Sequence, residues 1–172
     1  MLTSCLLISG YFFFKHNSAP AIATARPTVA TYVPPTRTSP AGMKEYRDEQ
    51  YRFSIFIPED IVVERKAEEQ GAATITFEDT SNARGFEIFV VPYLEAQVSE
   101  ERFREDIPSG VRTDTRDVSI DGAVGATFHA THAAIGETSE IWFIRDGYLY
   151  EVLAPRPSEA WLTEVMMTWK FL

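Results

Sequence analysis

Residues 43–172 predict an α+β fold, in which an antiparallel β-sheet is combined with two helices. Short segments rich in β-branched and aromatic residues recur through this part of the chain, and some of them alternate apolar with polar residues. Two Asp-Gly pairs, at 121–122 and 146–147, stand between strand-forming segments, as two-residue hairpin turns require. Residues 158–169 carry apolar side chains at helical spacing. These patterns indicate one globular domain.

The first strands are expected between residues 51 and 92. Residues 51–57 alternate for several positions until Pro58 ends the segment. Residues 61–65 and 73–77 are two further strand candidates, and residues 85–92 form a nearly continuous apolar run. Such a run is typical of a strand that is covered on both faces, so we expect this strand to be central in its sheet.

The first helix is expected from Ser99 to about Asp106. The Ser99 hydroxyl can accept a hydrogen bond from a free amide group of the following turn. Glu100 and Glu101 favour the positive end of the helix dipole. The segment has few apolar residues, with Phe103 as an inward contact, so this helix is expected to lie on the surface.

The C-terminal part is expected to form a hairpin and the second helix. The hairpin joins residues 140–145 to residues 148–153 around an Asp-Gly turn. The helix begins at Ser158, which is the expected capping residue, and its apolar stripe is expected to pack on the sheet. That stripe consists of Trp161, Leu162, Val165, Met166 and Trp169.

Charge is distributed unevenly along the chain. Residues 1–42 hold three basic residues and no acidic residue, whereas residues 43–172 hold all 25 acidic residues and 13 of the 16 basic ones. The domain therefore has a formal charge of −12 and repels a phosphate backbone, and no basic stripe is present. Nucleic acid is excluded as an expected partner. The single cysteine, Cys5, lies outside the domain, so the domain contains no disulfide.

Residues 1–16 predict an apolar membrane anchor or signal segment. Residues 1–14 carry no charge and are followed by Lys15, but at about 1.5 Å per residue they are shorter than a bilayer core of about 30 Å. Four interpretations remain open: an anchor helix that begins upstream, a signal peptide cleaved near the small residues 18–23, a lipobox that would lipidate Cys5, and a buried structural N-terminus.

Residues 17–42 predict a flexible stalk. Of these 26 residues, 19 are Ala, Thr, Ser, Pro or Gly, and five of them are prolines spread through the segment. Such a composition buries too little apolar area to fold and favours extended polyproline II. We therefore expect a single N-terminal anchor in the cell membrane with the domain on the extracytoplasmic side, or a secreted domain if the segment is a cleaved signal.

Several short motifs of the domain resemble a known family. They are residues 45–58, which contain Phe-Ser-Ile-Phe-Ile-Pro, residues 99–103, residues 148–152 after an Asp-Gly turn, and the closing Met-Thr-Trp-Lys-Phe at 167–171. In this order they resemble PsbP-like domains, which are named for the P extrinsic subunit of the photosystem II oxygen-evolving complex. The resemblance implies an antiparallel sheet flanked by helices in an α/β/α sandwich, and a non-catalytic role in assembly or binding.

The sequence assigns no metal-binding residue. His129 and His132 are three residues apart in an expected strand, so their side chains point to opposite faces and could not bind one metal ion without a bulge. The acidic pairs, such as Glu100 and Glu101, are typical of a solvated surface. Residues 78–82 only vaguely approach the oxygen spacing of a calcium loop.

The sequence likewise assigns no catalytic or cofactor-binding residue and no cofactor, and it predicts that the chain is not an enzyme. There is no Gly-x-Ser-x-Gly motif, and residues 121–126 lack the Gly-x-Gly start of a phosphate-binding loop. A concentration of aromatic residues could line a pocket or docking face, but core packing is expected. These residues are Trp142, Phe143, Tyr148, Tyr150, Trp161 and Trp169.

Two classes of function follow from these observations. The first is a non-catalytic extracytoplasmic binding or assembly module that is tethered to a membrane and has a protein partner. The alternative is a small extracytoplasmic hydrolase whose site is built from residues scattered in the sequence. A hydrolase would require a cleft lined by at least two convergent titratable groups.

The N-terminal composition generates a test of the tether. The full chain should fractionate with membranes, whereas a chain that begins at Met43 should be soluble and monodisperse, because it lacks the apolar segment. Membrane flotation followed by immunodetection measures both. Recovery of the intact, uncleaved full chain in the soluble fraction would contradict the tether.

Overall fold

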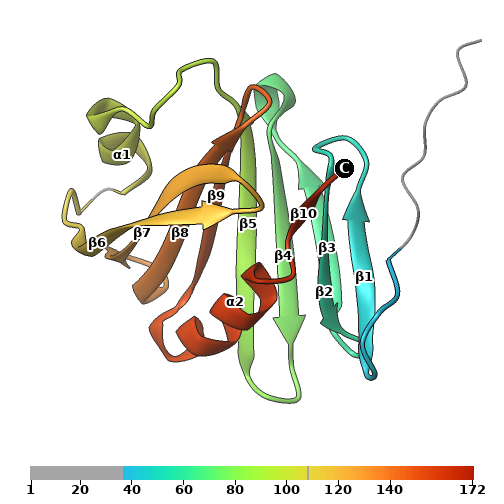
Figure 1. Ribbon diagram of the computed structural model, residues 1–172. Helices are drawn as coiled ribbons and strands as arrows, with labels where there is room; N and C mark the ends of the chain where they lie inside the picture. The colour runs from blue at the N-terminus through green and yellow to red at the C-terminus, as the bar shows by residue number, and fades with distance from the viewer. Residues whose placement is uncertain (1–36, 108) are drawn as a thin grey trace, which may run out of the picture. The chain divides into compact units, whose positions relative to one another are not determined.

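The computed structural model describes residues 37–107 and 109–172. The predicted membrane segment and most of the predicted stalk lie outside these described residues. The described chain forms a seven-stranded sheet, a three-stranded sheet and two short α-helices (Figure 1). Neither helix of this part is long and apolar enough to cross a membrane.

Both sheets are antiparallel throughout. The large sheet has the order β3–β4–β5–β9–β8–β7–β6, and the small sheet has the order β1–β2–β10. The strands of the large sheet are β3 (Val62–Ala67), β4 (Ala73–Asp79), β5 (Arg84–Pro92), β6 (Thr113–Ile120), β7 (Ala123–His132), β8 (Gly136–Arg145) and β9 (Tyr148–Pro155). Those of the small sheet are β1 (Met43–Asp48), β2 (Phe53–Pro58) and β10 (Lys170–Phe171). The 3₁₀ turns are η1 (Glu69–Gly71) and η2 (Arg156–Ser158).

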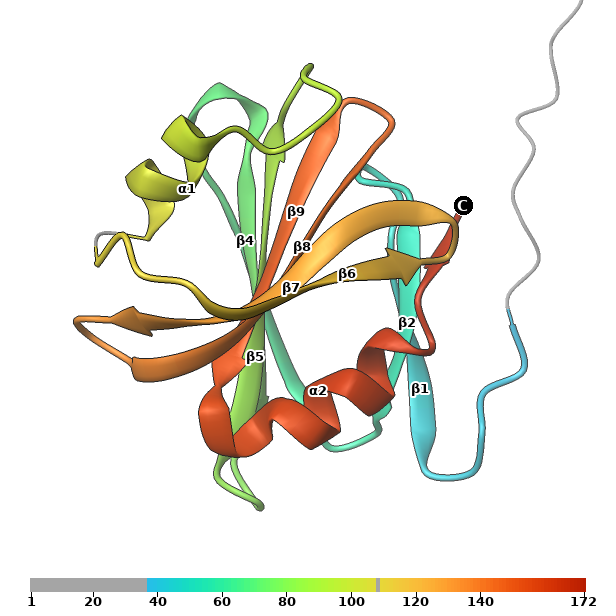
Figure 2. The same cartoon turned by 60° about the vertical axis from the view of Figure 1, so that its left-hand side comes forward.

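The main core lies between one face of the large sheet and a layer formed by the small sheet and α2 (Glu159–Met166). Figures 1 and 2 show α2 lying across the strands of the large sheet. The rings of Phe53 and Trp169 stack with centroids 4.3 Å apart, and the Trp169 ring meets the edge of Phe143 at 5.1 Å. Burial of these large apolar surfaces is the main force that holds the two layers together.

The other face of the large sheet carries a smaller core under α1 (Glu100–Asp106). Phe103 stacks on Trp142 with ring centroids 4.7 Å apart, and Phe128 packs edge-on against both rings. This cluster lies on the strands β7, β8 and β9. On the same face of β3 and β4, by contrast, the outward side chains are half-buried or exposed.

The predicted α+β class and the antiparallel sheet are confirmed, but the α/β/α layering is not. On one side a small sheet joins α2 in the covering layer, and on the other side the seven-residue α1 covers only part of the large sheet. The expectation for residues 85–92 was partly wrong. The strand β5 lies inside the sheet, but its second face is only half-buried: Val91 packs at the border of the smaller core under α1, and Phe89 lies beyond that core.

The two Asp-Gly turns are confirmed as hairpin turns. Asp121 and Gly122 have φ angles of 45° and 85°, and Asp146 and Gly147 have φ angles of 51° and 82°. A type I′ turn needs positive φ at both central residues, and its twist matches that of the strands it joins. The turns connect β6 to β7 and β8 to β9.

Of the two predicted N-terminal caps, the structure confirms the one at Ser99 and not the one at Ser158. Ser99 accepts a hydrogen bond from the Arg102 amide at 3.2 Å, as expected for an N-cap. Ser158 makes no such bond, because the 3₁₀ turn η2 leads directly into α2. The helix also ends at Met166, so Trp169 is not part of it. Trp169 nevertheless enters the same core from the segment before β10.

The packing of α2 generates a stability prediction. Trp161 is buried, and its ring lies 5.4 Å from that of Phe86 and under the Arg84 guanidinium at 4.4 Å. Trp161→Ala should lower the free energy of unfolding by about 3–5 kcal/mol, because burial is lost and a cavity is left. Urea unfolding measures the change. Glu164→Ala on the exposed side of α2 is the control and should cost far less, and an equal effect of both variants would contradict this packing.

Candidate functional site

The two histidines of β7 lie on opposite faces of the sheet, as the strand period predicts. His129 faces the side of α2, where its Nε2 lies 3.0 Å from Glu159 Oε1, while its Nδ1 lies 3.0 Å from Asp114 Oδ2. His132 faces the other side, where its Nε2 lies 2.8 Å from Glu140 Oε1. The two imidazoles therefore belong to separate clusters.

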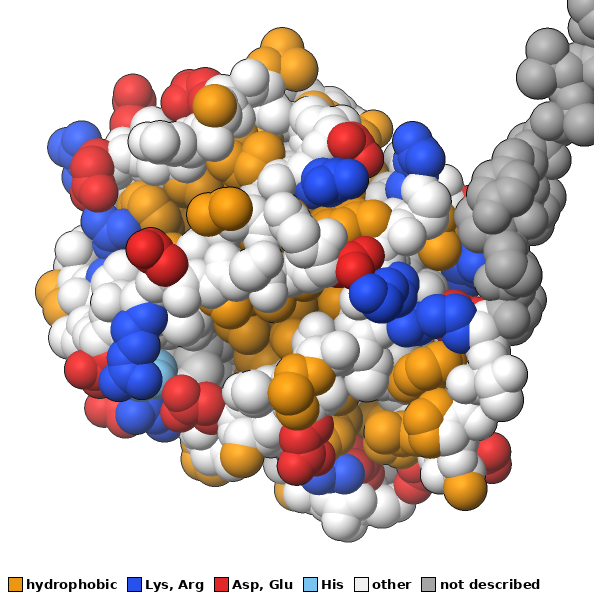
Figure 3. Space-filling model, in the orientation of Figure 1, with side chains coloured by type: hydrophobic (Ala, Val, Ile, Leu, Met, Phe, Trp, Pro, Cys, Tyr) orange, Lys and Arg blue, Asp and Glu red, His pale blue; other side chains and the backbone are white. Residues whose placement is uncertain are grey.

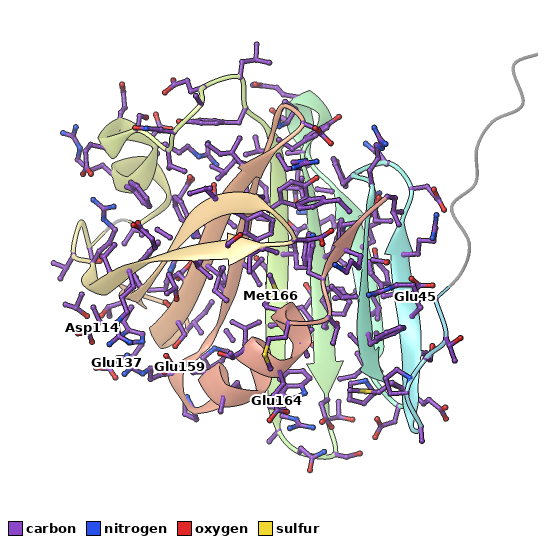
Figure 4. The ribbon with its side chains drawn as sticks, in the orientation of Figure 1. Glu45, Asp114, Glu137, Glu159, Glu164 and Met166 are labelled. Carbon is purple, nitrogen blue, oxygen red and sulfur yellow. The ribbon has the colours of Figure 1, made fainter. Side chains whose placement is uncertain are left out.

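His129 lines a hollow of about 530 Å³ at the end of the β7–β8 hairpin. Glu137 and Arg156 also line it, and Figure 4 shows Asp114, Glu137 and Glu159 gathered in this region. These side chains reach the same place from β6, β8, η2 and α2. This is a hollow with convergent titratable groups, which is the feature that the hydrolase alternative requires.

The hydrogen bonds around His129 restrict what this hollow can do. Each ring nitrogen lies 3.0 Å from a carboxylate oxygen, Nδ1 from Asp114 and Nε2 from Glu159, so both nitrogens are occupied by side chains of the fold. The bond from His129 lowers the pKa of Glu159 below its usual range. The imidazole between two carboxylates joins β6 to α2, and it leaves no ring nitrogen facing the hollow as a general base would need.

Among the described residues, the side chains that contact the ring nitrogens of His129 are carboxylates, not nucleophiles. Ser139 is the cross-strand partner of His129, but its hydroxyl is buried and makes no hydrogen bond with the imidazole. A Ser-His pair therefore does not form, although a triad mechanism depends on one.

On the other face, Glu140 is almost fully buried at 1% exposure. Its Oε1 accepts a hydrogen bond from the Thr138 hydroxyl at 2.7 Å and faces His132, and its Oε2 accepts a bond from Trp142 Nε1 at 3.0 Å. Both carboxylate oxygens thus have donors, which offsets the cost of removing the group from water. The cluster fixes the side chains beneath the smaller core.

A second buried carboxyl lies one strand away, on β9. Glu151 Oε1 is 2.8 Å from Arg102 Nη2, and Arg102 also pairs with Asp106 on the same helix. The pKa of Glu151 is raised to about 8, mainly by burial and also by the Asp106 carboxylate, with Arg102 opposing both effects. Burial also raises the pKa of Asp106. These groups attach α1 to the sheet.

A third feature is an apolar hollow of about 320 Å³ between β6 and α2. Figure 3 shows hydrophobic side chains exposed at the middle of this face. Ile141, Met166 and Trp169 line it, and Lys170 and Asp121 pair at its rim. The hollow is the part of the main face that the small sheet does not reach.

The structure shows where the segment considered as a calcium loop and the six clustered aromatic residues lie. Asp79, in the segment considered as a calcium loop, is buried and accepts hydrogen bonds from Asn82 and Arg84. Within residues 37–107 and 109–172, no three His, Cys, Asp or Glu side chains are grouped as a metal site. Of the six aromatic residues, Phe143, Tyr150, Trp161 and Trp169 lie in the main core, Tyr148 packs at its border, and Trp142 lies in the smaller core.

Sequence reasoning missed Glu140, Glu151 and Arg102. A signal was present for the two glutamates, because each interrupts a strongly apolar strand at a position that faces a covered surface. A charged residue at such a position needs a partner. The partner Arg102 is 49 residues from Glu151, so only the folded chain identifies it.

The described arrangement of a large antiparallel sheet, a small sheet and two helices is a PsbP-like fold. The solution structure of cyanobacterial PsbP (CyanoP) from Synechocystis sp. PCC 6803 matches it with a TM-score of 0.56 and 9% sequence identity, over 81% of this chain and 98% of that chain. At this identity the likeness shows the fold alone. No family model and no curated protein matches the sequence.

The Glu151 cluster generates a pH prediction. A folded-state pKa of about 8 lies above the unfolded value, so the folded state binds more protons between about pH 4.5 and 8, and stability falls as pH rises through that interval. At about 1.4 kcal/mol per pKa unit, the fall should be a few kcal/mol in urea unfolding. Glu151→Gln should remove most of this slope, whereas Glu101→Gln on the exposed side of α1 should not. Parallel pH profiles for Glu151→Gln and the unmodified protein would contradict the assignment.

Proposed function

We propose that this chain is a non-catalytic binding or assembly module with a protein partner, held outside a membrane by its N-terminal segment. One observation carries the proposal: in the best candidate for a catalytic hollow, both nitrogens of His129 are bound to carboxylates. The histidine joins two elements of the fold and has no substrate-facing nitrogen. The PsbP-like fold supports the same class, since the resemblance implies binding or assembly.

The extracytoplasmic tether is supported by composition. Residues 1–14 are uncharged and apolar, and the Pro, Ala and Thr-rich residues 17–42 separate them from the domain. A stalk of this length reaches roughly 80 Å when fully extended at about 3.1 Å per residue. A module on such a stalk can search for partners around its anchor, at the high effective concentration that a tether provides.

A small hydrolase is the second candidate, and the hollow around His129 is the observation that favours it. For His129 to act as a base, substrate binding would have to displace Glu159 or Asp114 from its ring. The nucleophile would then be water, because the Ser139 hydroxyl is not bonded to the imidazole. This route requires breaking an existing ion pair before any chemistry begins.

Affinity capture of the tagged full chain from its own membranes tests the proposed function. A protein partner should co-purify in near-stoichiometric amount, and His129→Gln should capture it equally well, because His129 serves the fold in this proposal. Mass spectrometry of the captured material measures both. Absence of any protein partner, together with a hydrolytic activity on ester or peptide substrates that His129→Gln abolishes, would favour the hydrolase instead.

A further inference from the structure

The large sheet has an uncovered region on the face opposite α2. We call it the open face and define it by Val62, Glu64, Thr76, Glu87, Phe89 and Leu153. Cross-strand pairing places Glu64 beside Thr76, Thr76 beside Glu87, and Glu87 beside Leu153, so these side chains form one row across β3, β4, β5 and β9. Neighbouring strands are about 4.8 Å apart, so Glu64 and Glu87 are roughly 10 Å apart along the row.

Apolar side chains flank Glu87 on the open face. Phe89 and Leu153 are half-buried, and Val62 at its edge is 55% exposed. A solvated sheet face normally alternates with polar side chains, and an aromatic ring at the centre of a wide sheet loses contact area unless something packs on it. Protein–protein interfaces likewise combine apolar side chains with charged groups that pair across the contact.

The charge on this face is strongly one-sided. Glu64, Glu78 and Glu87 project from it, whereas the only basic side chain that the strands β3, β4 and β5 direct to this face is Lys66. Lys66 is already paired with Glu68 at 2.9 Å. A complementary partner must therefore bring positive charge of its own.

Glu87 is a half-buried acid without a cationic partner among the described residues. No Lys, Arg or His side chain of the described residues lies within ion-pair distance of it, although fifteen such pairs occur elsewhere in this part of the chain. Burial raises its pKa, and the nearby carboxylates of Glu68 and Glu140 raise it further, against the opposing effects of Thr76 and His132. A cation placed beside Glu87 would offset both the burial and the repulsion.

We propose that the open face docks a basic segment of a protein partner, with a Lys or Arg against Glu87 and apolar side chains on Phe89 and Leu153. The inference rests on the proposed function, because it names the surface and the partner chemistry of that binding module. The separation of Glu64 and Glu87 also restricts the partner. Two cations about 10 Å apart, as at positions i and i+7 of a helix, would contact both glutamates together.

Other occupants fit the open face less well. A second copy of the chain would place acid against acid in a two-fold interface, which is repulsive. An anionic lipid surface would be repelled in the same way. A basic protein segment is the occupant that complements both the acidic groups and the apolar side chains of the open face.

Photo-crosslinking in native membranes tests the surface. A photoreactive phenylalanine analogue replaces Val62 on the open face, or Met167 on the opposite side, in the full chain. Both side chains are exposed and apolar, at 55% and 75%, so neither exchange alters charge or core packing. The Val62 position should yield a crosslink to a partner peptide rich in Lys and Arg, and the Met167 position should yield at least tenfold less of it.

Each other outcome of the crosslinking has a defined meaning. Crosslinks of the captured partner from Met167 alone would overturn the inference while leaving the proposed function intact. Crosslinks from Val62 to another copy of the chain, to lipid, or to an acidic segment would also overturn it. If affinity capture of the unmodified full chain recovers no protein partner at all, the proposed function fails and the inference fails with it.

Two pairs of charge-reversing substitutions provide a second test of the open face. Glu64→Lys with Glu87→Lys should reduce recovery of the captured partner at least tenfold, and Glu59→Lys with Glu164→Lys, which changes the net charge equally, should leave it within twofold. Thermal unfolding checks that each variant is folded. If Glu87→Lys prevents folding, Glu64→Lys with Glu87→Gln replaces it, since Gln is nearly isosteric with Glu. Equal recovery from both pairs would overturn the inference.

Discussion

The packing of Trp169 is the interaction on which the rest of this structure depends. Its ring stacks on Phe53 of β2 and meets the edges of Phe143 and Tyr150 on the large sheet, at 5.1 and 5.6 Å. The strand β10 pairs with β2 through only two residues, so side-chain burial, and not the hydrogen-bond ladder, holds the C-terminus in place. That contact joins the small sheet to the large one.

The two faces of the large sheet are covered to different extents. The seven-residue helix α1 is too small to shield seven strands, so the second face is part core, part polar network and part open surface. Near α1, the carboxyl groups of Glu140 and Glu151 are buried and need hydrogen-bond donors, which Trp142 and Arg102 supply. Farther from α1, the same face is left to solvent or to a partner.

These networks support the proposal of a binding role. The titratable groups that approach one another satisfy one another, as His129 does with Asp114 and Glu159. Catalytic groups generally keep one reactive atom free toward a cleft. In the described part of the chain, the open face has apolar side chains beside acidic groups that lack a cationic partner. Surfaces of that kind act by association, and their specificity comes from charge and shape.

The sequence by itself determined the local features: the Asp146-Gly147 turn, the Ser99 cap and the alternation of the strands, because each depends on neighbouring residues. It also placed His129 and His132 on opposite faces, since a strand has a period of two. Only the tertiary structure decided that α2 ends before Trp169, that β10 joins β2, and that Arg102 meets Glu151 from 49 residues away. Those outcomes depend on long-range packing and on the partner that each buried charge finds, and no local pattern encodes either.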